Sequence, residues 1–126
     1  GEEMDEQRGA LRHALLYRAM ALSSDGGVVL DSDDAVDELD RWAPNASTFT
    51  EDDDKDTYVL AHARRDANRG RPGAALAAIR ARLKVSNARA LHDAKLELLE
   101  TLELEDWVRL GKEDLLRRYP PATNPL

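Results

Sequence analysis

The side chains best suited to chemistry form two short acidic clusters, and the first matches part of a cation site. Asp52, Asp54 and Asp56 occupy the first, third and fifth positions of an EF-hand calcium loop. Thr57 stands where that loop needs its glycine, and Ala63 stands where it needs its bidentate glutamate. We therefore expect these acids to open a helix, whose dipole they complement, rather than to bind a metal.

The second acidic cluster consists of Asp33, Asp34 and Asp37, spaced as DDxxD. In isoprenoid synthases this spacing holds Mg²⁺ and a diphosphate, together with a second acidic motif and a large helical cavity. A chain of 126 residues is too short for that cavity, so the pattern favours helix capping. A small metal- or diphosphate-dependent enzyme that uses these three acids is the third of three functional hypotheses.

The histidines give no sign of a metal or catalytic site. His13, His62 and His92 are far apart, and none has a second ligand at HxxxH or ExxH spacing. The chain also lacks a glycine-rich phosphate loop and a GxSxG nucleophile motif. We therefore expect no enzymatic activity, no metal and no cofactor.

The most informative segment is the basic stretch 70–95, which predicts a helix, a tight turn and a second helix. Leu83 and Val85 are expected to bracket the turn and to face a shared core. The hydroxyl of Ser86 is expected to cap the helix that follows, which begins near Asn87. This arrangement is typical of a helix-turn-helix, which presents the start of its second helix to the major groove.

The stretch resembles the helix-turn-helix family, and more narrowly the DNA-binding segment of plasmid KfrA-type proteins. The resemblance is that of a short motif and covers about a fifth of the chain. Lys84 stands where a glycine is common in the turn, and no long coiled coil follows, so the KfrA architecture does not carry over. The matching motifs are Gly70-Arg71-Pro72, the helix from Ala78 to Leu83, the L-x-V-S turn from Leu83 to Ser86, and Ser86-Asn87.

The resemblance implies binding to double-stranded DNA. Asn87, Arg89 and His92 would meet base edges or nearby phosphates, and the remaining basic residues would bind phosphates and hold the register. The alternative is an amphipathic helical hairpin whose arginines are solvated. The predicted DNA-binding residues are Arg71, Arg80, Arg82, Ser86, Asn87, Arg89, His92 and Lys95.

Composition and periodicity predict an all-α fold, a compact bundle of about five or six helices in one domain over residues 1–126. Strand-forming aromatic and β-branched residues are scarce. The run 28–30 is too short to classify and fits a brief strand, a wing or a buried linker. Residues 1–3 are interpreted as a tag remnant and 120–126 as a loose tail. Helices are expected at 4–22, 31–43, 50–69, 72–83, 87–102 and 112–119.

Charge is unevenly distributed along the chain. The net charge is −7, yet residues 31–56 hold 11 acids and 2 bases, while residues 62–95 hold 9 bases and 2 acids. The lack of cysteine favours a cytoplasmic setting, and no apolar run approaches the length of a membrane span.

Two hypotheses follow from this charge distribution. The first is a sequence-specific DNA-binding protein, a small transcriptional or plasmid or phage regulator that works as a homodimer, with the long first helix as its dimer element. The second is an acidic protein-binding module, such as an antitoxin, immunity protein or inhibitor, whose segment 31–56 faces a basic partner and mimics a nucleic acid. The arrangement of charges on the surface distinguishes them.

Overall fold

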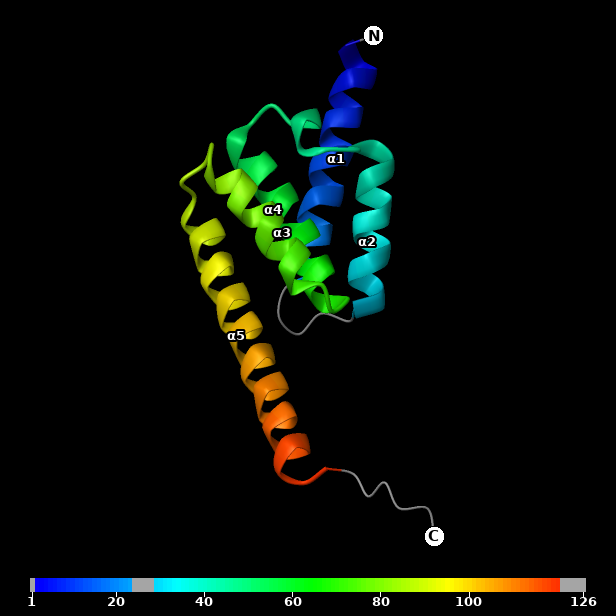
Figure 1. The fold of residues 1–126 in the computed structure, drawn as a ribbon. Helices are drawn as coiled ribbons and strands as arrows, with labels where there is room; N and C mark the ends of the chain where they lie inside the picture. The colour runs from blue at the N-terminus through cyan, green and yellow to red at the C-terminus, as the bar shows by residue number, and fades with distance from the viewer. Residues whose placement is uncertain (1, 24–28, 121–126) are drawn as a thin grey trace.

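Every regular element in the described part of the chain is a helix, which confirms the all-α expectation (Figure 1). The computed structural model describes residues 2–23 and 29–120. None of the helices in these two ranges is long and apolar enough to cross a lipid bilayer. The elements are α1 (Glu2–Ser23), α2 (Val29–Trp42), the 3-10 helix η1 (Ala46–Thr48), α3 (Asp52–Asn68), α4 (Pro72–Leu83) and α5 (Arg89–Arg118).

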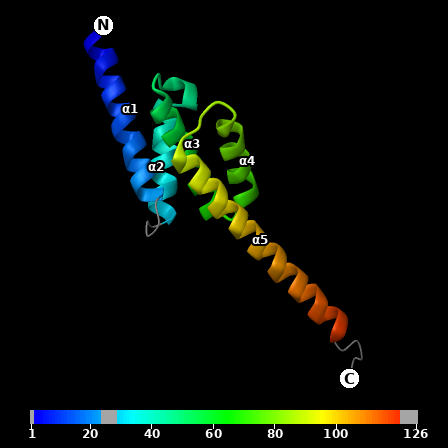
Figure 2. The same cartoon turned by 90° about the vertical axis from the view of Figure 1, so that its left-hand side faces the viewer.

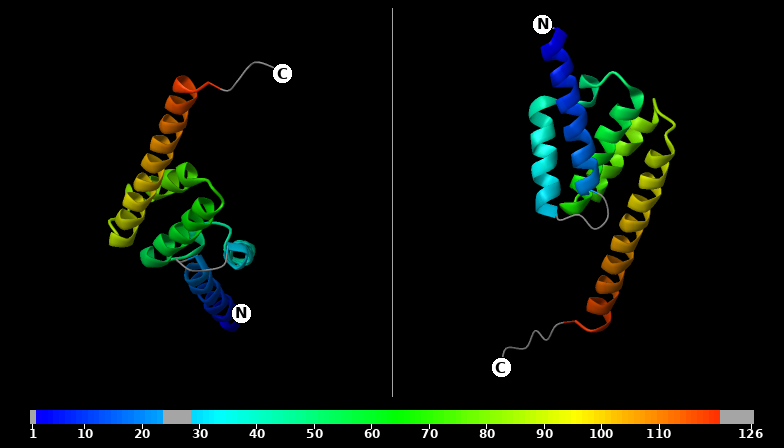
Figure 3. Two further views of the ribbon diagram at one scale, coloured as in Figure 1. Left: turned by 90° about the horizontal axis from the view of Figure 1, so that it is seen from below. Right: turned by 180° about the vertical axis from the view of Figure 1, so that it is seen from behind.

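The helices run alternately up and down, and α3 lies between two pairs (Figures 1 and 3). On one side α1 and α2 pack against α3 through a core that includes Leu16, Val36 and Leu39, all fully buried. The helix expected at 31–43 is thus present as α2 and packs its apolar residues into this core, although Trp42 at its end is 41% exposed.

A second core lies on the other side of α3, where α4 and α5 pack. Ile79 of α4 and Leu91 of α5 are fully buried there, beside Leu60 of α3. The start of α4 at Pro72 and its end at Leu83 agree with the sequence prediction. Gly70 adopts φ +77°, a conformation that L side chains rarely take, and so permits the sharp turn from α3 into α4.

The start of α2 differs from the sequence prediction. Val29 and Leu30 belong to α2, so they form neither a strand nor a wing, and Val28 lies outside the described residues. The helix expected to start at residue 31 begins two residues earlier, so Asp31 and Ser32 stand inside it.

The prediction of two separate helices after residue 87 is wrong. The structure has one continuous α5 of 30 residues, from Arg89 to Arg118. Only Gly111 interrupts the run of helix-forming residues there, and an isolated glycine weakens a helix without ending it.

The expected burial of Val85 is also wrong, because its side chain is 74% exposed. Leu83 does pack, half-buried, against the second core. Next to Val85 the turn is fixed by Ser86, whose hydroxyl donates a 2.9 Å hydrogen bond to Asp56 of α3. With this residue turned toward α3, Val85 is left pointing away from the core.

This difference gives a stability test. We expect Ile79→Ala to lower the free energy of unfolding by about 2–5 kcal/mol, because it opens a cavity in the second core. We expect Val85→Ala, a truncation of similar kind in the adjoining turn, to change it by less than about 0.5 kcal/mol. Urea unfolding followed by circular dichroism measures both, and equal losses would contradict the packing described here.

Candidate functional site

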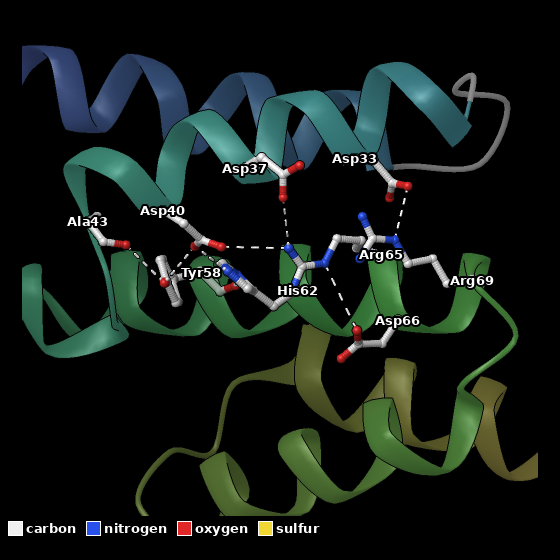
Figure 4. Close-up of polar contacts among 9 residues, drawn as sticks. All are labelled: Asp33, Asp37, Asp40, Ala43, Tyr58, His62, Arg65, Asp66 and Arg69. Carbon is white, nitrogen blue, oxygen red and sulfur yellow. Dashed lines mark hydrogen bonds and ion pairs between the residues drawn. The ribbon is translucent and has the colours of Figure 1, made fainter.

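A network of polar side chains joins α2 to α3 and centres on Asp40 (Figure 4). The hydroxyl of Tyr58 lies 3.0 Å from Asp40 Oδ1 and 2.9 Å from the carbonyl oxygen of Ala43. His62 Nε2 lies 2.6 Å from the same carboxylate, while His62 Nδ1 lies 2.9 Å from the carbonyl of Tyr58. Burial, and then the Asp40 carboxylate, raises the pKa of Tyr58. Because both His62 nitrogens already have partners, this cluster links helices and leaves the imidazole no free atom for a substrate.

Two of the three acids of the DDxxD pattern, Asp33 and Asp37, pair with arginines of α3 (Figure 4). Asp33 accepts a 3.0 Å hydrogen bond from Arg69, and Asp37 lies 3.6 Å from Arg65. The Arg65 side chain is only 16% exposed and also contacts Asp40. Within residues 2–23 and 29–120, no group of three or more histidine or acidic side chains converges in a way that could hold a metal ion.

The acids that open α3 diverge toward different helices. Asp54 is buried and its Oδ2 lies 2.6 Å from His13 Nε2 on α1. Asp56 is buried against α4, where its two oxygens accept hydrogen bonds from Arg82 at 2.6 Å and from Ser86 at 2.9 Å. The hydrogen bond from His13 to the backbone carbonyl of Gly9, and then its bond to Asp54, raise the pKa of His13. These carboxylates hold neighbouring helices in place, and the helix-opening prediction for the run is met by α3 beginning at Asp52.

Two of the predicted DNA-binding residues belong to this internal network. The Arg82 side chain is 13% exposed and lies against Asp56. The hydroxyl of Ser86 accepts a hydrogen bond from the amide of Ala88 at 3.3 Å while donating to Asp56. Ala88 itself stands at the N-cap of α5, so Ser86 fixes the turn just before the helix rather than capping it.

The other predicted DNA-binding residues lie closer to the surface. Arg89 has a side chain that is 94% exposed, with Asp93 3.8 Å away, and His92 Nε2 lies 2.9 Å from Asn87 Oδ1. Further along the same helix, Glu97 and other exposed residues are acidic. The basic residues of the predicted DNA-binding segment are therefore confined to the first turns of α5, ahead of the acidic stretch 97–106. Arg71, Arg80, Asn87, Arg89 and His92 are exposed, and Lys95 is half-buried.

The second half of α5 carries an apolar surface that the sequence analysis did not anticipate. From residue 103 to residue 118 every side chain is exposed except Asp114, which is half-buried. This half of the helix projects beyond the bundle (Figures 1 and 2), and we call residues 103–118 the α5 arm. Its six large apolar side chains are between 54% and 67% exposed: Leu104, Trp107, Val108, Leu110, Leu115 and Leu116.

The spacing of apolar residues in the sequence already indicates the apolar stripe of the arm. Leu104, Val108 and Leu115 recur at intervals of four and seven residues, which places them on one face of a continuous helix. Splitting α5 into two helices broke that periodicity and concealed the stripe.

Comparison with known proteins adds no relative. No protein-family model, curated protein or solved structure matches the chain. Within the described residues, the start of α5 and the α5 arm are the two surfaces that combine exposure with binding chemistry.

The link between Asp56 and Arg82 can be measured by a double-mutant cycle. We expect Asp56→Ala to lower the free energy of unfolding by about 3 kcal/mol. The largely buried guanidinium of Arg82 would lose its hydrogen-bond partner and keep only the exposed Asp52 at 3.7 Å. The cycle with Arg82→Ala should give a coupling energy of about 1–3 kcal/mol. Asp53→Ala, in an exposed position nearby, should cost less than about 0.5 kcal/mol. Additive losses in the cycle would contradict the internal role of Arg82.

Proposed function

We propose that this chain is a protein-interaction module and that the α5 arm is its binding surface. The observation that carries the proposal is the row of large apolar side chains on residues 103–118, each more than half exposed. Scattered apolar residues are normal on protein surfaces, but a contiguous apolar stripe on one element is typical of a protein interface. Leucine, valine and tryptophan together on one helix face suit a helical partner.

Helix energetics supports the same function. A helical segment as short as the α5 arm is only marginally stable in water on its own. Most helices in proteins are stabilised by packing their apolar face against a neighbour. The bundle packs α5 only as far as Leu102, which is half-buried against the second core. Beyond that residue a partner would supply the missing packing and stabilise the arm.

The proposal alters the acidic protein-binding hypothesis. That hypothesis assigned the partner to the acidic segment 31–56. Asp33, Asp37, Asp40 and Asp56 each lie against an arginine of the same chain, and Asp54 contacts His13, so fewer of these acids are free to meet a partner. The apolar arm is the better docking surface.

Site-directed photo-crosslinking in the native cells tests this function. A photoreactive residue in place of Trp107, which is 67% exposed on the arm, should form a covalent adduct with a polypeptide. The same residue in place of Arg41, exposed on α2, is the control and should form none. A chain that crosslinks at neither position would contradict the proposed function.

DNA binding is the second candidate function, and the exposed side chains at the start of α5 favour it. Arg89 and Asn87 are free of the core at the beginning of a helix that follows a short turn, as a recognition helix requires. Arg71 and Arg80 are exposed on the preceding segment and could neutralise phosphates.

Salt-dependent titration against random and genomic duplexes tests this second function. If DNA binds here, Arg80→Ala should weaken binding to all sequences and lower the salt slope by about one unit. Asn87→Ala should cost about 1–3 kcal/mol on a preferred site and less on random DNA. Arg41→Ala removes the same charge from α2 and should change neither quantity. Absence of any salt-sensitive affinity in the parent protein would exclude this candidate.

A further inference from the structure

The apolar stripe on the α5 arm has the spacing of a helix-pairing seam. Leu104, Val108, Gly111 and Leu115 follow one another at intervals of four, three and four residues, the alternation that keeps a seam facing a second helix. Trp107 flanks the seam and is 67% exposed. An added Cβ at Gly111 would meet nothing within 4 Å, so the space above this glycine is open.

The charges along α5 are unevenly distributed, so that a second copy of the helix running in the opposite direction complements the first. Residues 97–106 hold five acids and no base, whereas residues 107–118 hold four bases and two acids. In an antiparallel pair of identical helices centred near Arg109, residues 101–106 of each copy, with three acids, lie against residues 113–118 of the other, where two acids are followed by Arg117 and Arg118. In a parallel pair, like charges lie together and repel.

We propose that two copies of this chain associate through their α5 arms as an antiparallel, two-fold symmetric helix pair. This rests on the proposed protein-binding role of the arm and specifies the partner as a second copy. The homodimer expected from the sequence then forms through α5 rather than through the first helix. Such an interface is isologous, so it closes on itself and leaves no open site for a third copy.

The spacing of the seam sets the register of this pair. With the two-fold axis close to Arg109, Leu104 packs near Leu115 of the partner subunit, and Val108 packs near Gly111 of the partner subunit. Gly111 then has a role. Because it has no side chain, the two backbones can approach closely where Val108 packs against Gly111 of the partner subunit. Beside the seam, Glu105 lies near Lys112 of the partner subunit, and symmetry repeats the pair.

Most of the large exposed apolar side chains of the arm lie on the side that carries the seam. The six large apolar side chains of the arm are each more than half exposed, and four of them lie on or beside the seam: Leu104, Trp107, Val108 and Leu115. Leu110 and Leu116 are the exceptions, since their positions in the repeat put them outside the seam and its flanks, on different sides of the helix.

Sedimentation of the full chain over a range of concentrations tests the proposal. We expect a monomer–dimer equilibrium whose dissociation constant rises about 100-fold in Leu104→Glu, because each interface would bury two unpaired charges. Leu110→Glu makes the same change on the other side of the arm and should leave the dissociation constant unaltered. Circular dichroism of both variants checks that the bundle remains folded.

A charge-reversal series tests the direction of the pair. Glu105→Lys and Lys112→Glu should each weaken the dimer about 10-fold, and the double variant should restore it. In a parallel pair Glu105 would instead face Glu100 of the partner subunit, so Glu105→Lys would strengthen association and overturn the antiparallel arrangement.

The outcomes separate this inference from the proposed function. A purified chain that stays monomeric, or a dimer unaffected by Leu104→Glu, overturns the self-association. If position 107 still crosslinks to another polypeptide in cells, the binding role of the arm survives with a different partner. Binding of a monomeric chain to anionic lipid vesicles, abolished by Leu104→Glu, would overturn both by assigning the stripe to a membrane surface.

Discussion

The position of α3 between two cores is the constraint on which the rest of this structure depends. Tyr58 and Ala61 pack toward α1 and α2, while Leu60 and Ala63 pack toward α4 and α5. A helix covered on two sides has little surface left for solvent, so its charged residues must also find partners inside the protein. This requirement explains why buried acids at one end of α3 and arginines at the other contact neighbouring helices.

Because of those contacts, the charge distribution along the sequence does not produce two oppositely charged surfaces. Along the sequence, an acidic segment is followed by a basic one, which suggests two surfaces of opposite sign. In the fold, Arg65 and Arg69 of the basic segment lie against Asp37 and Asp33 of the acidic segment, and Arg82 lies against Asp56. Many of the charged side chains therefore orient α2 and α4 on α3, and fewer remain exposed to attract a charged ligand.

The two halves of α5 show how one helix can serve two purposes. Its first half contributes Leu91 and Leu98 to the second core, which fixes its direction relative to α3 and α4. Its second half continues that direction past the end of the bundle (Figure 2). The rigidity of a continuous helix thus presents the apolar stripe away from the bundle, where a partner can reach it without disturbing either core. The proposed pairing and the candidate DNA face use different parts of α5 and do not compete.

The sequence by itself determined the helical class and the position of α4, because Gly70 and Pro72 act through local backbone geometry and the apolar spacing repeats once per turn. It also predicted helices at 31–43 and 72–83, whose apolar residues Val36, Leu39 and Ile79 are all buried in the fold. Only the tertiary structure decided that Arg82 and Ser86 serve Asp56, that Val85 faces solvent and that the second half of α5 is uncovered. The physical reason is that ion pairing and burial depend on neighbours far away along the chain, whereas helix formation depends mainly on residues within one or two turns.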